Sequence, residues 1–206
     1  MSDLYQNFED LRHHNILGTD YQIRYQKKQS GVLFKAIHGG GIEPGTSELA
    51  ELSAGVDDSY YCFEGIRSTG NSELHITSIH FDEPTAIEVV SQSLYTVSYH
   101  GYAGGQVKNT IVGGLDDKLA LEVTTELKLA GFNADQSGRT MQIGGRNPAN
   151  IVNKNHRGKG VQLEISFEQR KVLFDNFSGP QRRQTVNRTF YEYIEAIKKA
   201  LNQVKI

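Results

Sequence analysis

A histidine and a glutamate stand five positions apart in the segment Ala36-Ile-His-Gly-Gly-Gly-Ile-Glu43. Imidazole nitrogens and carboxylate oxygens are both ligands of Zn²⁺ in proteins. The glycines between them allow a tight backbone turn, and we expect them to leave open volume beside the imidazole. Such a turn can bring Glu43 back toward His38, so the segment predicts two ligands of a zinc site.

Two other interpretations of this segment stay open. A glycine-rich loop that opens a helix can bind phosphate, but the segment lacks the GxxxxGK[ST] pattern and has no lysine that could reach a phosphate. The second alternative is a purely structural pair of His38 and Glu43.

A second histidine occupies an equivalent position further along the chain. His100 follows the apolar residues 94–99 in the way that His38 follows residues 32–37. Two histidines and Glu43 supply the three protein ligands of a catalytic zinc site, whose fourth position holds water. We therefore expect His38, Glu43 and His100 to bind the metal.

Two more histidines compete for the third ligand position. His80 ends the apolar residues 74–79, so it is the stronger rival and also a candidate substrate contact. His75 lies between Leu74 and Ile76, which is more typical of a hydrogen-bonded core histidine.

A glutamate is the best candidate for a general base. Glu164 is flanked by apolar residues in Val161-Gln-Leu-Glu-Ile-Ser166, and a carboxylate in a buried strand is unfavourable unless it is paired or functional. A structural ion pair or an exposed edge position is the alternative. The chain has no HExxH or GxSxG motif, and Cys62 has no evident partner, so nucleophilic catalysis is less supported.

These residues need strands and helices to position them. We expect strands at residues 32–37, 60–66, 74–79, 94–99, 110–112 and 161–167, and helices at 46–56, 84–93, 115–130 and 189–204. Asp82 is a candidate N-cap of the second helix, and Thr189 with Glu192 forms a candidate capping box for the last one. The alternation predicts an α/β fold in which helices flank a mixed, largely parallel sheet. Sites in such sheets lie beyond the C-terminal ends of central strands.

Composition fits one domain spanning residues 1–206. Hydrophobic residues make up 37% and charged residues 22% of the chain, and the net charge is −2. The single cysteine excludes an intrachain disulfide. No apolar run reaches the roughly 18 residues that a membrane span needs, and the polar N-terminus does not resemble a secretory signal.

Basic residues cluster in two stretches that contain no acid. Residues 136–163 hold Arg139, Arg146, Lys154, His156, Arg157 and Lys159, and residues 177–191 hold Arg182, Arg183 and Arg188. Either these are solvated loops, or they form a surface for an anionic substrate.

Four segments, taken together, resemble the phage and Bacillus poly-γ-glutamate hydrolases. They are Ala36-Ile-His-Gly-Gly-Gly-Ile-Glu-Pro-Gly-Thr-Ser-Glu-Leu-Ala50, Leu74-His-Ile-Thr-Ser78 leading to Phe81-Asp-Glu-Pro84, Val97-Ser-Tyr-His-Gly101 and Gly160-Val-Gln-Leu-Glu-Ile-Ser166. They occur in family order and span nearly the whole chain.

The resemblance implies an α/β fold similar to zinc carboxypeptidases. It also implies zinc held by His38, Glu43 and His100, Glu164 as general base, and endo-type cleavage of γ-linked polyglutamate. Carboxypeptidases space their first two ligands HxxE, whereas this chain has HxxxxE, so their substrate-binding arginines cannot be mapped onto it by counting.

A polymer with one free α-carboxylate per residue requires arginine or lysine contacts, and arginine binds carboxylate in a bidentate manner. Arg146 and Asn147, which follow two glycines, are the preferred substrate contacts, and Arg67 is the second choice. Either arginine could instead stabilise the oxyanion.

Two other functions remain open from the sequence: a zinc amidohydrolase for small acyl-amino acids or peptides, and a non-catalytic module that binds anionic polymer or nucleic acid through residues 139–159. The expected partner is poly-γ-glutamate, with zinc as cofactor, no membrane or nucleic-acid partner, and a monomeric state. We expect a cytoplasmic location until release, followed by action outside the cell after lysis if the chain is phage-encoded.

Overall fold

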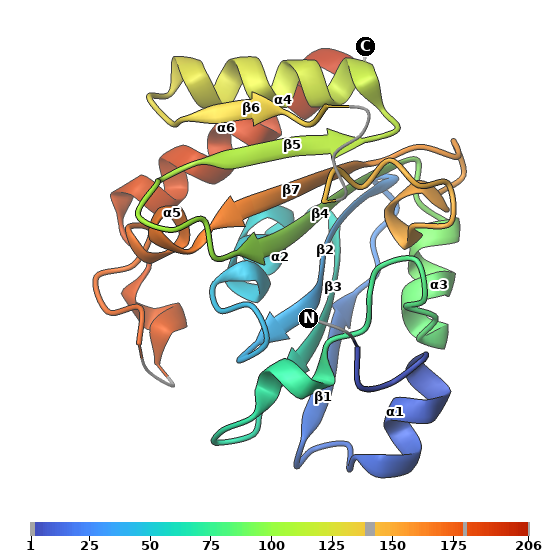
Figure 1. Ribbon diagram of the computed structural model, residues 1–206. Helices are drawn as coiled ribbons and strands as arrows, with labels where there is room; N and C mark the ends of the chain where they lie inside the picture. The colour runs from blue at the N-terminus through green and yellow to red at the C-terminus, as the bar shows by residue number, and fades with distance from the viewer. Residues whose placement is uncertain (1–2, 139–142, 179–180, 206) are drawn as a thin grey trace.

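The computed structural model describes residues 3–138, 143–178 and 181–205, which form one seven-stranded sheet with helices on both sides (Figure 1). The strand order is β1-β3-β2-β4-β7-β5-β6. Strand β1 pairs antiparallel with β3, and β5 pairs antiparallel with β7, while the other neighbours run parallel. The predicted α/β class with a mixed, largely parallel sheet is confirmed.

The strands are β1 (Tyr21–Gln26), β2 (Val32–Gly40), β3 (Ser59–Gly65), β4 (Tyr95–Tyr102), β5 (Thr110–Gly114), β6 (Ala134–Gln136) and β7 (Val161–Ser166). The α-helices are α1 (Phe8–His14), α2 (Thr46–Ala54), α3 (Pro84–Ser91), α4 (Asp117–Leu129), α5 (Phe167–Lys171) and α6 (Arg188–Val204). The described residues also form three short 3₁₀ helices, η1 (Asn71–Leu74), η2 (Ile151–Asn153) and η3 (Arg182–Thr185). The four predicted helices are all present, whereas β1, β6, α1 and α5 were not predicted.

The strand predicted at residues 74–79 is wrong. Leu74 ends η1, and residues 75–79 form a loop. Burial does alternate here, because Leu74, Ile76 and Ser78 are buried while Thr77 is exposed. The carbonyl of Ile76 accepts a hydrogen bond from a side chain, His38, instead of pairing with a strand. The alternating burial of these residues therefore reflects side-chain packing and not membership of the sheet.

Two predicted caps are also wrong. Glu83, not Asp82, caps α3, because its carboxylate accepts the backbone N–H groups of Thr85 and Ala86. Asp82 instead accepts the backbone N–H of Phe8.

At the start of α6 the cap is Asn187, whose side chain accepts the N–H of Phe190. Glu192 forms an ion pair with Arg188 instead of the predicted capping box with Thr189. The helix begins one residue earlier than predicted, so the capping role moves with it.

Side chains of the central strands alternate between two apolar clusters on opposite faces of the sheet. Val32, Phe34 and Ala36 of β2 belong to the cluster that α2, α4 and α6 cover. Leu33 and Ile37 belong to the other cluster, to which α1 and α3 contribute. Within the described ranges, no helix is both long and apolar enough to cross a membrane.

Helix α4 offers a matched test of this packing. Leu127 is fully buried, whereas Leu129 on the same helix is 72% exposed. Leu127→Ala should lower the free energy of unfolding by about 2–5 kcal/mol, because it removes buried methyl groups and leaves a cavity. Leu129→Ala should change it by less than about 0.5 kcal/mol. Chemical denaturation of both variants measures the difference, and equal effects would contradict the packing described here.

Candidate active site

A bulge in β2 sets the direction of His38. The pairing between β2 and β3 shifts register between Ala36 and Gly39. His38 contacts Ile76, which belongs to the same apolar cluster as Ile37, so two consecutive residues are directed to one face of the sheet. Regular alternation would send His38 to the opposite face.

The turn after β2 brings Glu43 back to His38, as expected. The backbone N–H of Glu43 donates to the carbonyl of His38 at 2.8 Å, and Thr46 Oγ1 donates to the carbonyl of Glu43 at 2.8 Å. Thr46 opens α2, so the helix fixes the end of the turn.

The glycines of this turn do not themselves face open space. A Cβ on Gly39 would lie 2.0 Å from Ser47 Oγ, and one on Gly40 would lie 2.3 Å from the carbonyl oxygen of Gly65. Gly40 also has a φ of +64°, which L-residues rarely adopt. The glycines are required because the turn packs directly against the end of β3.

His100 and Glu164 come from neighbouring strands and face the same side. They are register partners in the parallel pair β4–β7. Tyr99 and Leu163, the residues before them, lie in the cluster on the opposite face of the sheet. Parallel register therefore sets the two side chains next to each other on the face to which the bulge directs His38.

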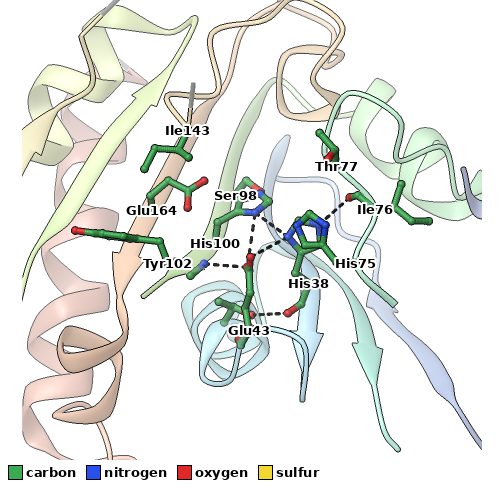
Figure 2. Close-up of polar contacts among 12 residues, drawn as sticks. His38, Glu43, His75, Ile76, Thr77, Ser98, His100, Tyr102, Ile143 and Glu164 are labelled. Carbon is green, nitrogen blue, oxygen red and sulfur yellow. Dashed lines mark hydrogen bonds and ion pairs between the residues drawn. The ribbon is translucent and has the colours of Figure 1, made fainter. Parts of the chain in front are cut away.

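Three ligand-type side chains converge at the C-terminal edge of these strands, as Figure 2 shows. His38 Nδ1 lies 3.1 Å from Glu43 Oε1 and 3.1 Å from His100 Nδ1, and His100 Nδ1 lies 3.7 Å from Glu43 Oε2. Ligands at about 2.0–2.1 Å from a tetrahedral zinc ion lie about 3.4 Å apart. The separations between the two imidazole nitrogens and the carboxylate of Glu43 are close to this value.

Hydrogen bonding supports the same conclusion. The carbonyl of Ile76 can only accept, so the bond of 2.8 Å from His38 Nε2 puts the proton on that nitrogen and leaves a lone pair on Nδ1. This lone pair faces an acceptor oxygen of Glu43 and a second ring nitrogen. His100 Nε2 lies 3.0 Å from Ser98 Oγ, which can accept its proton and leave His100 Nδ1 with a lone pair too. A cation between the three atoms relieves their mutual repulsion, so the donor set fits a metal.

The remaining contact of Glu43 is to the backbone of β4. Gly101 N–H donates to Glu43 Oε2 at 2.8 Å. Burial lowers the pKa of His38, but the negative charge of Glu43 and the hydrogen bonds outweigh this and raise it, so without a metal a proton on Nδ1 supplies the positive charge that the cluster favours. Burial holds the pKa of His100 well below its ordinary value, so its imidazole is neutral, which is the form that binds metals.

Glu164 is the buried acid beside this cluster. Burial, with a further contribution from the charge of Glu43, raises the pKa of Glu164 to about 8. Gln162, two residues earlier on β7, donates its side-chain N–H to Glu164 Oε1 at 2.7 Å. A carboxyl group with a pKa near neutrality suits proton transfer in both directions.

The two rival histidines differ in position. His75 lies against the cluster, with its ring centroid 3.9 Å from that of His38, and its Nδ1 bonds Asp3 Oδ1 at 2.7 Å. His38, Glu43 and His75 also form a group whose ligand atoms lie within 4.8 Å of one another. His80 is exposed and does not line the cavity at this cluster.

A cavity of about 380 Å³ opens at the cluster. Six of the predicted site residues line it: His38, Glu43, His100, Glu164, Arg146 and Asn147. Arg146 also pairs with Asp117 at 2.7 Å. Arg67 lies outside this cavity, where it bonds Asp20, Glu73 and Asn15.

The basic stretches are largely compensated by acids from elsewhere in the chain. Arg157 and Lys159 pair with buried Asp116. Arg182 pairs with Glu48, and Arg183 with Glu51. Arg139 lies outside the described residues. The absence of acids within a stretch therefore did not predict an uncompensated positive surface.

Several residues of the site were not predicted from the sequence. Tyr102, Ile143, Asn150 and Gln162 line the cavity, and Arg170 lines an adjoining hollow that shares Glu43, Gly101 and Tyr102 with it. Gln162 could have been found, because it precedes Glu164 by two positions and therefore faces the same side of a strand. Arg170 gave no such signal, since its contacts are to distant backbone.

A His–Glu–His cluster with a buried acid beside it, at the edge of a mixed α/β sheet, is the kind of donor set that catalytic zinc sites of hydrolases use. Known proteins identify the family. The model of the poly-γ-glutamate hydrolase family matches residues 5–196, and the chain belongs to this family. Family membership makes it an enzyme rather than the non-catalytic module that the sequence left open.

Relatives and solved structures agree with this assignment. The chain is 46% identical to the SPbeta prophage-derived protein YoqZ of Bacillus subtilis (strain 168) over 98% of its own length and 73% of that protein. It is similar to a bacteriophage poly-γ-glutamate hydrolase structure, with a TM-score of 0.94, 38% identity and 99% of each chain covered. It is equally similar to the zinc-free apo structure of YndL, with a TM-score of 0.94, 43% identity and 100% of each chain covered.

The glycine turn can be tested with a matched pair of variants. Gly40→Val should abolish or strongly weaken metal binding, because its Cβ meets the backbone of β3. Gly131 also has a positive φ, of +88°, but a Cβ there meets nothing within 4 Å. Gly131→Val should therefore carry only the backbone strain of about 1–3 kcal/mol and keep its metal. Metal content and denaturation midpoints measure both effects, and a normal metal content in Gly40→Val would show that the turn is only a linker.

The raised pKa of Glu164 predicts a pH dependence of stability in the presence of a chelator. The folded protein binds the Glu164 proton up to about pH 8, whereas the unfolded chain releases it near its ordinary value of 4.5. Folding stability that comes from this proton is complete below pH 4.5 and is lost as pH rises to 8. Glu164→Gln removes this loss. The difference in free energy of unfolding between Glu164→Gln and the wild type should therefore shift in favour of the variant by a few kcal/mol as pH rises from 5 to 8. The size follows because one pKa unit corresponds to about 1.4 kcal/mol. A constant difference across this range would contradict the prediction.

Proposed function

We propose that this chain is a zinc-dependent hydrolase that cleaves γ-glutamyl amide bonds inside poly-γ-glutamate. The observation that carries the proposal is the convergence of His38, Glu43 and His100, with atom separations of 3.1–3.7 Å, beside the buried Glu164. We further propose that residues 1–206 form a single zinc hydrolase domain.

The donor set favours zinc as the metal. Two imidazole nitrogens and one carboxylate oxygen are a known set of three ligands for catalytic zinc. When bound, zinc would polarise the scissile carbonyl and lower the pKa of water. The zinc-free apo state described for the relative YndL is consistent with this choice.

Glu164 acts as general base and then as general acid. Its carboxylate takes a proton from the attacking water and later gives that proton to the leaving amine. Gln162 holds one carboxylate oxygen through a hydrogen bond of 2.7 Å, so the other oxygen is directed to the reacting atoms. A carboxyl group whose pKa is raised to about 8 binds the transferred proton well enough to deliver it.

The cavity offers groups for the substrate carboxylates. Arg146 lines it, and the acid that it pairs with, Asp117, is 73% exposed at its side chain. Exposed ion pairs contribute little to stability, so Arg146 can exchange this partner for a substrate carboxylate at low cost. Asn147 lies beside it on the same wall of the cavity.

The shape of the site supports cleavage at internal bonds. A second hollow of about 810 Å³ shares Glu43, His75, Gly101 and Tyr102 with the cavity at the cluster. The cluster is therefore accessible from two sides. An endo-acting enzyme needs this arrangement, because the polymer continues in both directions from the scissile bond.

Incubation with poly-γ-glutamate tests the function directly. We expect the zinc-loaded protein to shorten the polymer rapidly to mid-sized fragments, and a chelator to stop this. Glu164→Gln should keep its zinc and lose about 10²–10⁴-fold in kcat, whereas His38→Ala should lose the zinc itself. Size-exclusion chromatography of the products and metal analysis measure these outcomes.

A panel of short α- and γ-linked glutamyl peptides provides the control for substrate class. Cleavage of the short peptides with an unchanged polymer would favour the small-substrate amidohydrolase instead. An unchanged polymer with and without chelator, and no cleavage of the panel, would overturn the proposal.

A further inference from the structure

Arg170 is a buried cation that the proposed chemistry does not use. It lies on the short helix α5, directly after β7, and only 4% of its surface is exposed. Its planar guanidinium carries five N–H groups in a fixed geometry. Nε donates to the carbonyl of Ile165 at 3.1 Å, one terminal nitrogen donates to the carbonyl of Pro44 at 2.7 Å, and the other to that of Tyr102 at 3.5 Å.

These three carbonyls belong to the three segments that carry the site. Pro44 directly follows Glu43, Ile165 directly follows Glu164, and Tyr102 is two residues after His100. One guanidinium group is thus bonded to the backbone next to two proposed metal ligands and next to the proposed base. In sequence, these segments are separated by more than fifty residues each.

The absence of a side chain at Gly101 leaves room for this guanidinium group. A Cβ on Gly101 would lie 2.4 Å from Arg170 Cζ, so the guanidinium packs directly against the glycine. The N–H of the same glycine donates to Glu43 Oε2 at 2.8 Å. Gly101 therefore contacts the guanidinium and holds Glu43 at the same time.

The charge of Arg170 argues against a passive role. Within the described residues, its hydrogen-bond partners are carbonyl oxygens and not carboxylates. A buried charge without a directly bonded counter-ion is unfavourable for folding. Burial lowers the pKa of Arg170, and the negative charge of Glu43, which belongs to the site, opposes this effect.

We propose that Arg170 is a positioning residue that fixes Glu43, His100 and Glu164 relative to one another, so that Glu43 and His100 keep the spacing that a metal ion requires and Glu164 stays beside them. The inference rests on the proposed zinc site and deepens it. The simpler alternative is that Arg170 only anchors α5 to the sheet, in which case its removal lowers stability without changing the metal site.

Zinc affinity in competition with a chromophoric chelator separates the two roles. Arg170→Met should weaken zinc binding by about 10- to 100-fold, the range found for residues that orient metal ligands. Arg170→Lys keeps the charge, but its single nitrogen cannot reach three carbonyls, so it should recover only part of the affinity. Arg157→Met is the control, because Arg157 is a half-buried arginine that pairs with buried Asp116 and stacks on Tyr95 away from the site. The control should stay within about twofold of wild type.

Cobalt substitution gives a readout of geometry that a purely structural role would not change. The visible absorption of bound Co²⁺ depends on its coordination, so it should differ from wild type in Arg170→Met and remain unchanged in Arg157→Met. On the polymer, Arg170→Met should lower kcat more than it raises KM, because the substrate contacts at Arg146 are intact.

Gly101→Ala provides a second route if Arg170→Met does not fold. It keeps the arginine but displaces its guanidinium, and it should weaken zinc binding in the same direction. Wild-type zinc affinity and an unchanged cobalt spectrum in the folded variants would overturn the role of Arg170 while leaving the zinc site standing. Failure of the wild type itself to bind zinc would overturn the proposed function, and the Arg170 proposal with it.

Discussion

The site depends first on the bulge in β2. Without the register shift between Ala36 and Gly39, His38 would face α2 while His100 and Glu164 face the other side of the sheet. The other features of the site bring their groups to the face that this register shift gives His38. The turn returns Glu43, the parallel register of β4 and β7 aligns His100 with Glu164, and Arg170 bonds to the backbone behind all of them.

The face of the sheet that carries the site also has buried polar residues further along the same strands. Lys35, Ser98 and Gln162 occupy neighbouring register positions on β2, β4 and β7, and all are buried. Lys35 Nζ has no hydrogen-bond partner within the described part of the chain, and burial lowers its pKa to about 7. Such a layer contributes little to folding. The opposite face, where three helices pack on an apolar cluster, must therefore supply much of the stability that the site lacks.

The site residues could be predicted from the sequence more easily than the backbone features that position them. His38, His100 and Glu164 could be found because polar groups at the ends or in the middle of apolar strands stand out from their neighbours. The bulge, the bond from Gly101 to Glu43 and the role of Arg170 depend on backbone groups that any residue could supply, so residue type carried no signal. The false strand at residues 74–79 has the same origin, since alternating burial does not specify a pairing partner.

The turn between His38 and Glu43 has a consequence for how such chains can vary. Its glycines are packed against Ser47 and the carbonyl of Gly65, and its end is fixed by Thr46 at the start of α2. The turn could not accommodate an inserted or deleted residue without disrupting these contacts. The number of residues between His38 and Glu43 is therefore as constrained as these two proposed ligands themselves. The spacing HxxxxE distinguishes this turn from the shorter HxxE arrangement.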